Sequence, residues 1–164
     1  MEHYKIMKKI KFHIVYTFCL LSTLILLVSC HTGEKSTKAF SFPLNEITID
    51  EIHHGYDSGR YTVKGIVSKY INRINNIDQA GPEINSVIIV NPDAVKIADS
   101  LDQIQKRGKN KGLLFGIPVL LKDNIDTHDN MPTTAGSRIL KDSFPLKDSW
   151  VAKKLRDEGA VILG

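Results

Sequence analysis

The chain has 164 residues, of which 42% are hydrophobic and 24% are charged. This balance is typical of a globular protein of at most one ordinary domain, and it excludes an intrinsically disordered chain. The formal net charge is +4, but four of the 22 basic groups and one of the 18 acidic groups lie in residues 1–29. The remainder is nearly neutral, so composition gives no support for nucleic acid binding, which needs a basic patch on the folded part.

The first 29 residues resemble a bacterial lipoprotein signal peptide. Lysines cluster between positions 5 and 11, and an apolar stretch runs from residue 14 to residue 28. Ser29 then precedes Cys30, as in a lipobox, so we expect cleavage before Cys30 and lipid attachment to its thiol. The alternative is an uncleaved apolar anchor with Cys30 as an ordinary thiol. In both cases we expect export to the cell envelope and attachment to a membrane.

Residues 30–44 are expected to form a tether, and residues 45–164 a folded domain. The segment after Cys30 is polar and rich in small residues, which is typical of a flexible linker. Beyond it, cap residues and apolar spacings of three and four positions predict four helices. The expected caps are Thr48 for residues 49–56, Thr62 for a helix ending at residue 77, Asp93 for a helix ending at residue 106, and Asp148 or Ser149 for a helix that Gly159 ends.

Three short apolar runs are predicted to be strands, at residues 84–90, 117–121 and 160–163. The continuously apolar end of the first run indicates a strand that is buried on both faces. Pro118 can lie only near the start of the second strand, where no ladder donor is needed. Because strands alternate with helices, the expected fold class is α/β, with a largely parallel or mixed sheet.

The most informative stretch runs from Gly112 to Leu140 and reads GLLFGIPVLLKDNIDTHDNMPTTAGSRIL. Here the second predicted strand ends directly in Lys122, which is followed by an aspartate and an asparagine. A lysine at the tip of a buried strand must find partners for its ammonium or lose its proton, and a desolvated lysine can act as a general base. The more ordinary interpretation is that the aliphatic part of Lys122 packs on the core while its ammonium stays in water.

The motifs GIPVLLKDNIDT and MPTTAGSRIL resemble the N-terminal part of the amidase signature family, over roughly residues 45–164. The resemblance implies an α/β/α sandwich with a mixed sheet, of which this chain is about the first third, and hydrolysis of carboxylic amides. In that family the lysine of the Lys-Asp-Asn motif, which corresponds to Lys122, is the base of a Ser-cisSer-Lys triad. The two serines lie in a downstream Gly/Ser-rich segment of the GGSSGG type, which this sequence does not contain. We therefore expect a truncated domain that is inactive alone.

The loop that follows the Lys122 motif is long for a connection, and long loops are often functional. Within it Thr134, Ala135 and Gly136 are candidate substrate-binding residues, an assignment that leans on the resemblance. The alternative is a simple glycine turn.

Metal and cofactor sites are not expected. His53 and His54 are adjacent and would point to different faces, so they form a weak candidate for a metal site. Cys19 and Cys30 are the two cysteines of the chain, which leaves neither an internal disulfide nor a Cys-rich zinc site. There is no phosphate-binding glycine loop of the GxxxxGK[ST] kind.

Three functions remain open from the sequence. The first is an amidase that acts on a small-molecule or peptide amide. The second is a non-catalytic envelope lipoprotein, either a degenerate relative or a binding module. The third is the amidase-like component of an amidotransferase that acts on misacylated tRNA, because this component closely resembles these motifs. The export signal speaks against the third function, since tRNA charging is cytoplasmic.

Overall fold

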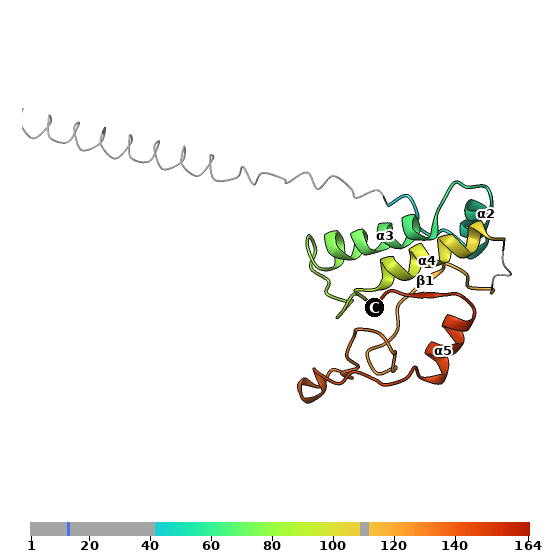
Figure 1. Ribbon diagram of the computed structural model, residues 1–164. Coiled ribbons are helices and arrows are strands. Elements are labelled where there is room, and N and C mark those ends of the chain that lie inside the picture. The colour runs from blue at the N-terminus through green and yellow to red at the C-terminus, as the bar shows by residue number, and fades with distance from the viewer. Residues whose placement is uncertain (1–12, 14–41, 109–111) are drawn as a thin grey trace, which may run out of the picture. The chain divides into compact units, whose positions relative to one another are not determined.

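The structure is a computed structural model that describes residue 13 and residues 42–108 and 112–164. Apart from residue 13, the expected signal peptide lies outside the described residues, as do the expected lipid-attachment site at Cys30 and most of the expected tether. Residues 42–164 make up one structural unit, and the elements described below all belong to it (Figure 1).

Helix α2 (Ile49–Asp57) begins at the predicted cap. The N–H of Glu51 donates to Thr48 Oγ1, and the N–H of Thr48 donates to the Glu51 carboxylate at 2.8 Å. These reciprocal bonds form a capping box, which satisfies two backbone donors that the first turn of a helix leaves free.

Helix α3 (Val63–Arg73) is likewise capped as predicted, because the N–H of Gly65 donates to Thr62 Oγ1 at 3.0 Å. The predicted apolar stripe packs inward, and its first three members, Val63, Ile66 and Val67, are almost fully buried. The helix continues as a π-helical turn, η1 (Ile74–Asp78), so the predicted end near residue 77 is confirmed.

Helix α4 (Ala94–Lys106) and helix α5 (Trp150–Asp157) also match their predicted ranges. Ser149 caps α5 by accepting the N–H of Ala152. Asp93 takes the cap position of α4, but its carboxylate makes no capping bond and accepts the side-chain amide of Asn130 at 2.7 Å. The predicted position of this cap is therefore confirmed, although the Asp93 side chain makes no capping hydrogen bond.

The sheet consists of two parallel strands, β1 (Pro118–Val119) and β2 (Val161–Ile162), with Pro118 opposite Val161. Pro118 is the first residue of β1, as expected for a residue that lacks a ladder donor. The N–H of Val161 donates to the carbonyl of Ile117 at 2.9 Å, and the N–H of Leu163 donates to the carbonyl of Val119 at 2.8 Å. Both strands are shorter than predicted.

The predicted strand at residues 84–90 does not form, and its buried character was also wrong. Asn85 has φ +53°, a left-handed conformation that interrupts an extended chain. The N–H groups of Ser86 and Val87 donate to the Asp78 carboxylate at 2.8 and 3.0 Å, so a side chain takes the donors that a neighbouring strand would use. Ile84 and Ile88 are exposed.

Side chains on and beside β2 alternate between two apolar clusters. Val161 and Leu163 pack in the larger cluster with residues of α3 and α4, whereas Ile162 packs with Ala152 of α5. Helices α3 and α4 therefore cover one face of the sheet and α5 covers the other, as Figure 1 shows. This layering is the α/β arrangement predicted from the sequence.

No helix in residues 42–108 or 112–164 combines the length and the apolar character that a membrane crossing requires.

Candidate functional site

A cavity of about 470 Å³ lies where the chain leaves β1, and the two sequence motifs meet there. Lys122 comes from the segment after β1, and Ala135 and Gly136 come from the loop that follows. Apolar side chains supply much of the rest of the wall, among them Leu121, Ile125 and Met131. Leu121 is held beside the end of β2, because its N–H donates to Gly164 at 3.0 Å.

Lys122 lines this cavity, but its side chain is exposed rather than desolvated. The predicted strand at residues 117–121 is shorter in the structure, where β1 ends at Val119 and pairs with β2 on one edge and with no other strand in the described part of the chain. Leu120 is accordingly half exposed, and the tip of the strand is open to water. Lys122 is thus an exposed residue of the cavity wall, and its role as a base stays a prediction.

Asp123 organises the turn that lines the cavity together with Lys122. Its carboxylate accepts the N–H of Thr134 at 2.9 Å, the hydroxyl of Thr134, and the N–H of Gly136 at 3.3 Å. Its own carbonyl accepts the N–H of Ala135 at 2.8 Å. Burial raises the pKa of the Asp123 carboxyl, but the hydrogen bonds from Thr134 and Gly136 outweigh burial, so its pKa lies below the usual value.

The three predicted substrate-binding residues take two different positions. Ala135 and Gly136 line the cavity, and both have positive φ, +48° and +74°. Thr134 is not among the lining residues, since both its N–H and its hydroxyl are taken by Asp123. The glycine-turn interpretation and the pocket interpretation are thus compatible: Asp123 builds the turn, and the turn presents Ala135 and Gly136 to the cavity.

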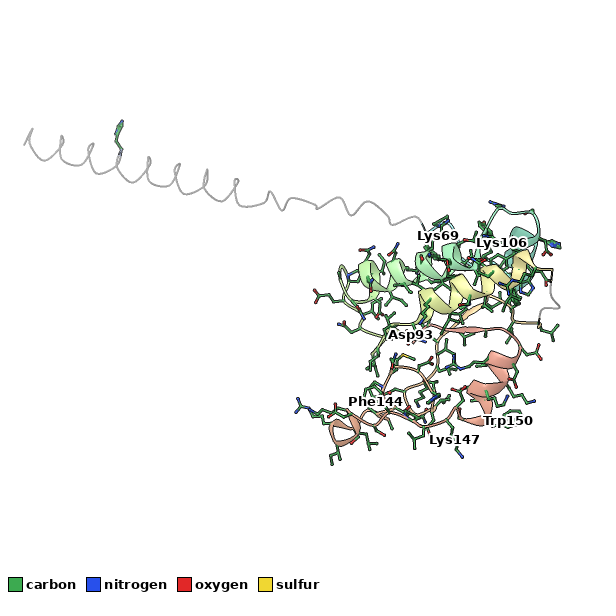
Figure 2. The ribbon with its side chains drawn as sticks, in the orientation of Figure 1. Lys69, Asp93, Lys106, Phe144, Lys147 and Trp150 are labelled. Atoms are coloured by element: carbon green, nitrogen blue, oxygen red, sulfur yellow. The ribbon has the colours of Figure 1, made fainter. Side chains whose placement is uncertain are left out.

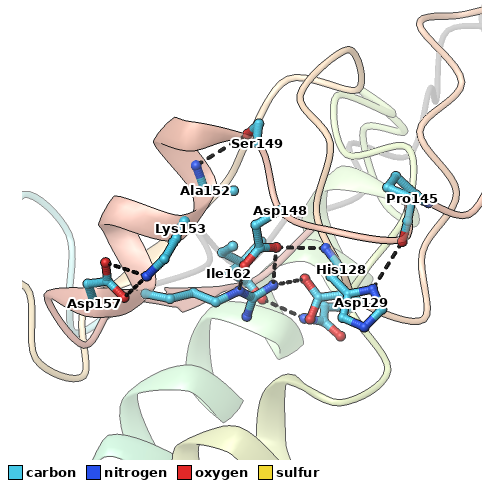
Figure 3. A network of polar contacts seen from close by, with 11 residues as sticks. His128, Asp129, Pro145, Asp148, Ser149, Ala152, Lys153, Asp157 and Ile162 are labelled. Carbon is cyan, nitrogen blue, oxygen red and sulfur yellow. Dashed lines mark hydrogen bonds and ion pairs between the residues drawn. The ribbon is translucent and has the colours of Figure 1, made fainter.

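The loop that carries this turn is closed at its base by an ion cluster (Figure 3). The guanidinium of Arg156, on α5, donates to Asp148 at 2.9 Å and also to Asp129. Asp148 in turn accepts the N–H of His128 at 2.7 Å. Close by, the N–H of Ser149 donates to the carbonyl of Asp126 at 2.9 Å, so the two ends of the loop are fastened together.

Sequence reasoning missed the structural roles of two carboxylates of this region, Asp123 and Asp148. Asp123 was noted only as part of the Lys122 motif, and its partners lie eleven to thirteen positions away, outside any local turn pattern. Asp148 was considered as a helix cap, whereas its carboxylate binds Arg156 and the His128 N–H. An aspartate that precedes a capping serine is a weak signal for such a cluster, because the partner arginine lies eight residues further along the chain.

Among the residues that the structure describes, no three His, Cys, Asp or Glu side chains are grouped so that they could hold a metal ion. His53 has a different contact, since its Nε2 lies 3.0 Å from the carbonyl oxygen of Phe115.

Comparison with known proteins gives a consistent result. The family model "Amidase" matches residues 65–164. An amidase-family protein of Schizosaccharomyces pombe is 38% identical over 135 residues, which cover 79% of this chain and 23% of that protein. A component of the glutamyl-tRNA(Gln) amidotransferase of Alkaliphilus metalliredigens is 40% identical over 122 residues, which cover 74% of this chain and 24% of the relative.

The solved structure of native peptide amidase from Stenotrophomonas maltophilia superposes with a TM-score of 0.73 at 38% identity, over 76% of this chain and 25% of that one. The chain therefore spans about a quarter of the length of the relatives it matches. Motifs, layered fold and sequence similarity lead to one conclusion: the chain belongs to the amidase family.

Proposed function

We propose that the protein containing this chain hydrolyses a carboxylic amide and that Lys122 is its general base. The observation that carries the proposal is the position of Lys122 on the wall of the cavity, next to the Asp123-held turn that presents Ala135 and Gly136. The resemblance of the Lys-Asp-Asn motif to the family's catalytic lysine supports the same assignment.

The chemistry needs a base because a serine hydroxyl is a weak nucleophile and an amide nitrogen is a poor leaving group. In the mechanism that the family resemblance implies, a serine oxygen attacks the carbonyl carbon while its proton passes through a bridging serine to the neutral lysine. The lysine then gives a proton to the departing nitrogen, and water releases the acid from the acyl-serine. The 164 residues have no Gly/Ser-rich segment that could supply the serines. We therefore propose that Lys122 acts only in the whole protein and that this chain is inactive alone.

The shape of the cavity favours a substrate that presents an amide on an apolar body. Leu121, Ile125 and Met131 offer apolar walls, and the turn that presents Ala135 and Gly136 shares the cavity with Lys122. A peptide amide meets this description, in line with the peptide amidase to which the fold is similar.

An ammonia-transferring component of the amidotransferase type is the second candidate, because a relative of that type is 40% identical over 122 residues. The expected export signal speaks against it. The two are separated by an assay with and without misacylated tRNA: an amidase releases ammonia or amine without tRNA, whereas the transferring component passes ammonia to the tRNA-bound residue. A binding module without activity would do neither.

The test uses the protein expressed from its whole reading frame, with release of ammonia or amine from a peptide amide as the readout. Lys122→Ala and Lys122→Arg should each lower turnover by at least about a hundredfold, the usual contribution of a general base. The arginine variant is the sharper one, because arginine keeps the charge but does not give up its proton. Lys106→Ala, an exposed lysine at the end of α4, is the matched control. Activity retained by Lys122→Arg would refute the role of Lys122 as the general base.

We also propose that Cys30 carries a lipid and that the protein is exported. Metabolic labelling with a fatty acid should mark the wild type and leave Cys30→Ala unlabelled. Wild-type protein that is unlabelled and found in the cytoplasm would contradict this proposal.

A further inference from the structure

Four large apolar side chains between residues 138 and 154 are more exposed than buried. Ile139 and Leu146 are 93% and 92% exposed, and Phe144 and Trp150 are 54% and 76% exposed. Single exposed apolar residues are common on proteins, but four large ones, two of them aromatic, lie here between residues 139 and 150, a concentration that is typical of contact surfaces. We name residues 138–154 the basic-apolar segment.

The same segment concentrates positive charge. It holds five basic residues, Arg138, Lys141, Lys147, Lys153 and Lys154, against the two acidic residues Asp142 and Asp148. Asp148 is turned inward to Arg156, Lys141 lies 3.7 Å from Asp142, and Lys153 binds Asp157 at 2.8 Å. Arg138, Lys147 and Lys154 are thus the basic residues of the segment with no acidic partner among the described residues. Residues 30–164 as a whole carry 18 basic and 17 acidic groups, so the excess of positive charge lies where the apolar side chains are exposed.

The aromatic and basic groups lie together on one side of the domain. Figure 2 shows Phe144, Lys147 and Trp150 on the side that faces away from α3 and α4. At the start of α5 the ammonium of Lys154 lies 5.9 Å from the centre of the Trp150 ring. Tryptophan and lysine are found together at membrane interfaces, where the indole sits at the level of the headgroups and the lysine stem reaches up to the phosphates.

We propose that the basic-apolar segment docks on an anionic lipid surface, with Leu146 and Trp150 entering the headgroup region and the surrounding lysines meeting lipid phosphates. A protein partner fits less well, because it would have to supply an acidic group for each basic head that it removed from water. A lipid surface supplies phosphates everywhere and leaves the ammonium groups hydrated. In this proposal the contact is interfacial.

Trp150 makes a direct test possible, because it is the single tryptophan of the chain. The full chain is mixed with vesicles of phosphatidylglycerol and phosphatidylethanolamine whose acyl chains carry bromine, which quenches an indole on contact. Quenching reports on Trp150 alone, so vesicle binding through the N-terminal apolar stretch does not imitate it. Vesicles of brominated phosphatidylcholine serve as the uncharged comparison.

We expect a blue shift and quenching of Trp150 with the anionic vesicles, both weakened by added salt. Leu146→Asp should lower the vesicle affinity reported by Trp150 about tenfold, and Lys147→Glu about fivefold. Leu113→Asp replaces a similarly exposed leucine outside the segment and should change nothing. Far-UV circular dichroism checks that the variants stay folded.

Two results would overturn the proposal. One is a chain that pellets with the vesicles while Trp150 is neither shifted nor quenched, which would show that the basic-apolar segment faces water or another polypeptide, such as further amidase sequence. The other is a blue shift without vesicles that grows with protein concentration, which would assign the surface to a second copy of the chain.

Discussion

Replacement of Arg156 by methionine should destabilise the domain far more than any other loss of charge on α5. The Arg156 side chain is 26% exposed, and its guanidinium binds Asp129, whose side chain is 5% exposed, as well as Asp148. Methionine keeps the apolar stem but leaves two adjacent carboxylates without a counter-ion. Breaking a buried ion pair costs about 3–5 kcal/mol, and because Arg156 still touches water we expect the lower end, about 3 kcal/mol.

Lys153→Met is the matched control, since it removes a cation from the same helix. Lys153 binds Asp157 at 2.8 Å, but the side chain of Lys153 is 66% exposed. An exposed pair of this spacing contributes about 0.3–0.5 kcal/mol. Both variants remove ion pairs, but the Arg156 pairs are more buried and involve two carboxylates rather than one.

Urea unfolding followed by far-UV circular dichroism measures both variants. With a slope of about 1–3 kcal/mol per molar urea, Arg156→Met should lower the midpoint by roughly 1–3 M, and Lys153→Met by a few tenths. Hydrogen exchange adds a local readout, because the His128 N–H donates to Asp148 and should lose its protection. If Arg156→Met lowers the midpoint no more than Lys153→Met, the ion cluster does not stabilise the base of the loop.

Three further predictions concern the turn, the core and pH. Ala135→Gly should raise the free energy of unfolding by less than about 1 kcal/mol, because glycine removes the strain at φ +48° but costs entropy on folding; a clear loss of stability in urea would contradict the left-handed turn. Gly116→Ala should lower the free energy of unfolding by about 3 kcal/mol, since a Cβ there would lie 2.8 Å from Tyr56 and Val63 at φ +72°; an unchanged urea midpoint would rule out this contact. The pKa values of Asp123 and Asp148 are lowered in the folded state, so their contribution is present above the unfolded value, near 3.8, and is lost as pH falls through the folded values. The urea midpoint should therefore decrease as the pH is lowered below about 4, and it should decrease less steeply in Asp123→Asn. An equally steep decrease in this variant would show that Asp123 does not contribute to the pH dependence of stability.

Helices could be predicted well from the sequence because the signals that fix them are local. Thr48, Thr62 and Ser149 each cap a helix through a bond to a residue only three positions away. An apolar stripe repeats within four positions, so a stretch such as α3 can be read without knowledge of the rest of the chain. The alternation of helices and strands then indicated the α/β class.

Strands were predicted less well, because pairing depends on partners that are distant in sequence. Residues 84–90 have the composition of a buried strand, yet the Asp78 carboxylate takes two of the backbone donors and Asn85 leaves the extended region. The strand before Lys122 is also shorter than predicted, and it has a single neighbouring strand among the described residues. Apolar composition indicates that a segment can pair, and it contains no information about which donors are free to do so.

In the candidate site, too, local features could be predicted from the sequence and long-range contacts could not. Lys122 was found through a motif, and the structure places it on the cavity wall, although exposed rather than buried. The long-range contacts that shape its surroundings, from Asp123 to Thr134 and from Arg156 to Asp129, have no fixed spacing and could not be predicted.

The alternating side chains beside β2 make this strand intolerant of changes in length. Val161 and Leu163 serve one helical layer and Ile162 serves the other, so loss of a single residue just before Val161 would send each of them to the wrong layer. A deletion there would undo the attachment of α5, and with it the arginine that fastens the loop beside Lys122. The three consecutive aliphatic residues of β2 and its end thus fix the position of α5 relative to α3 and α4.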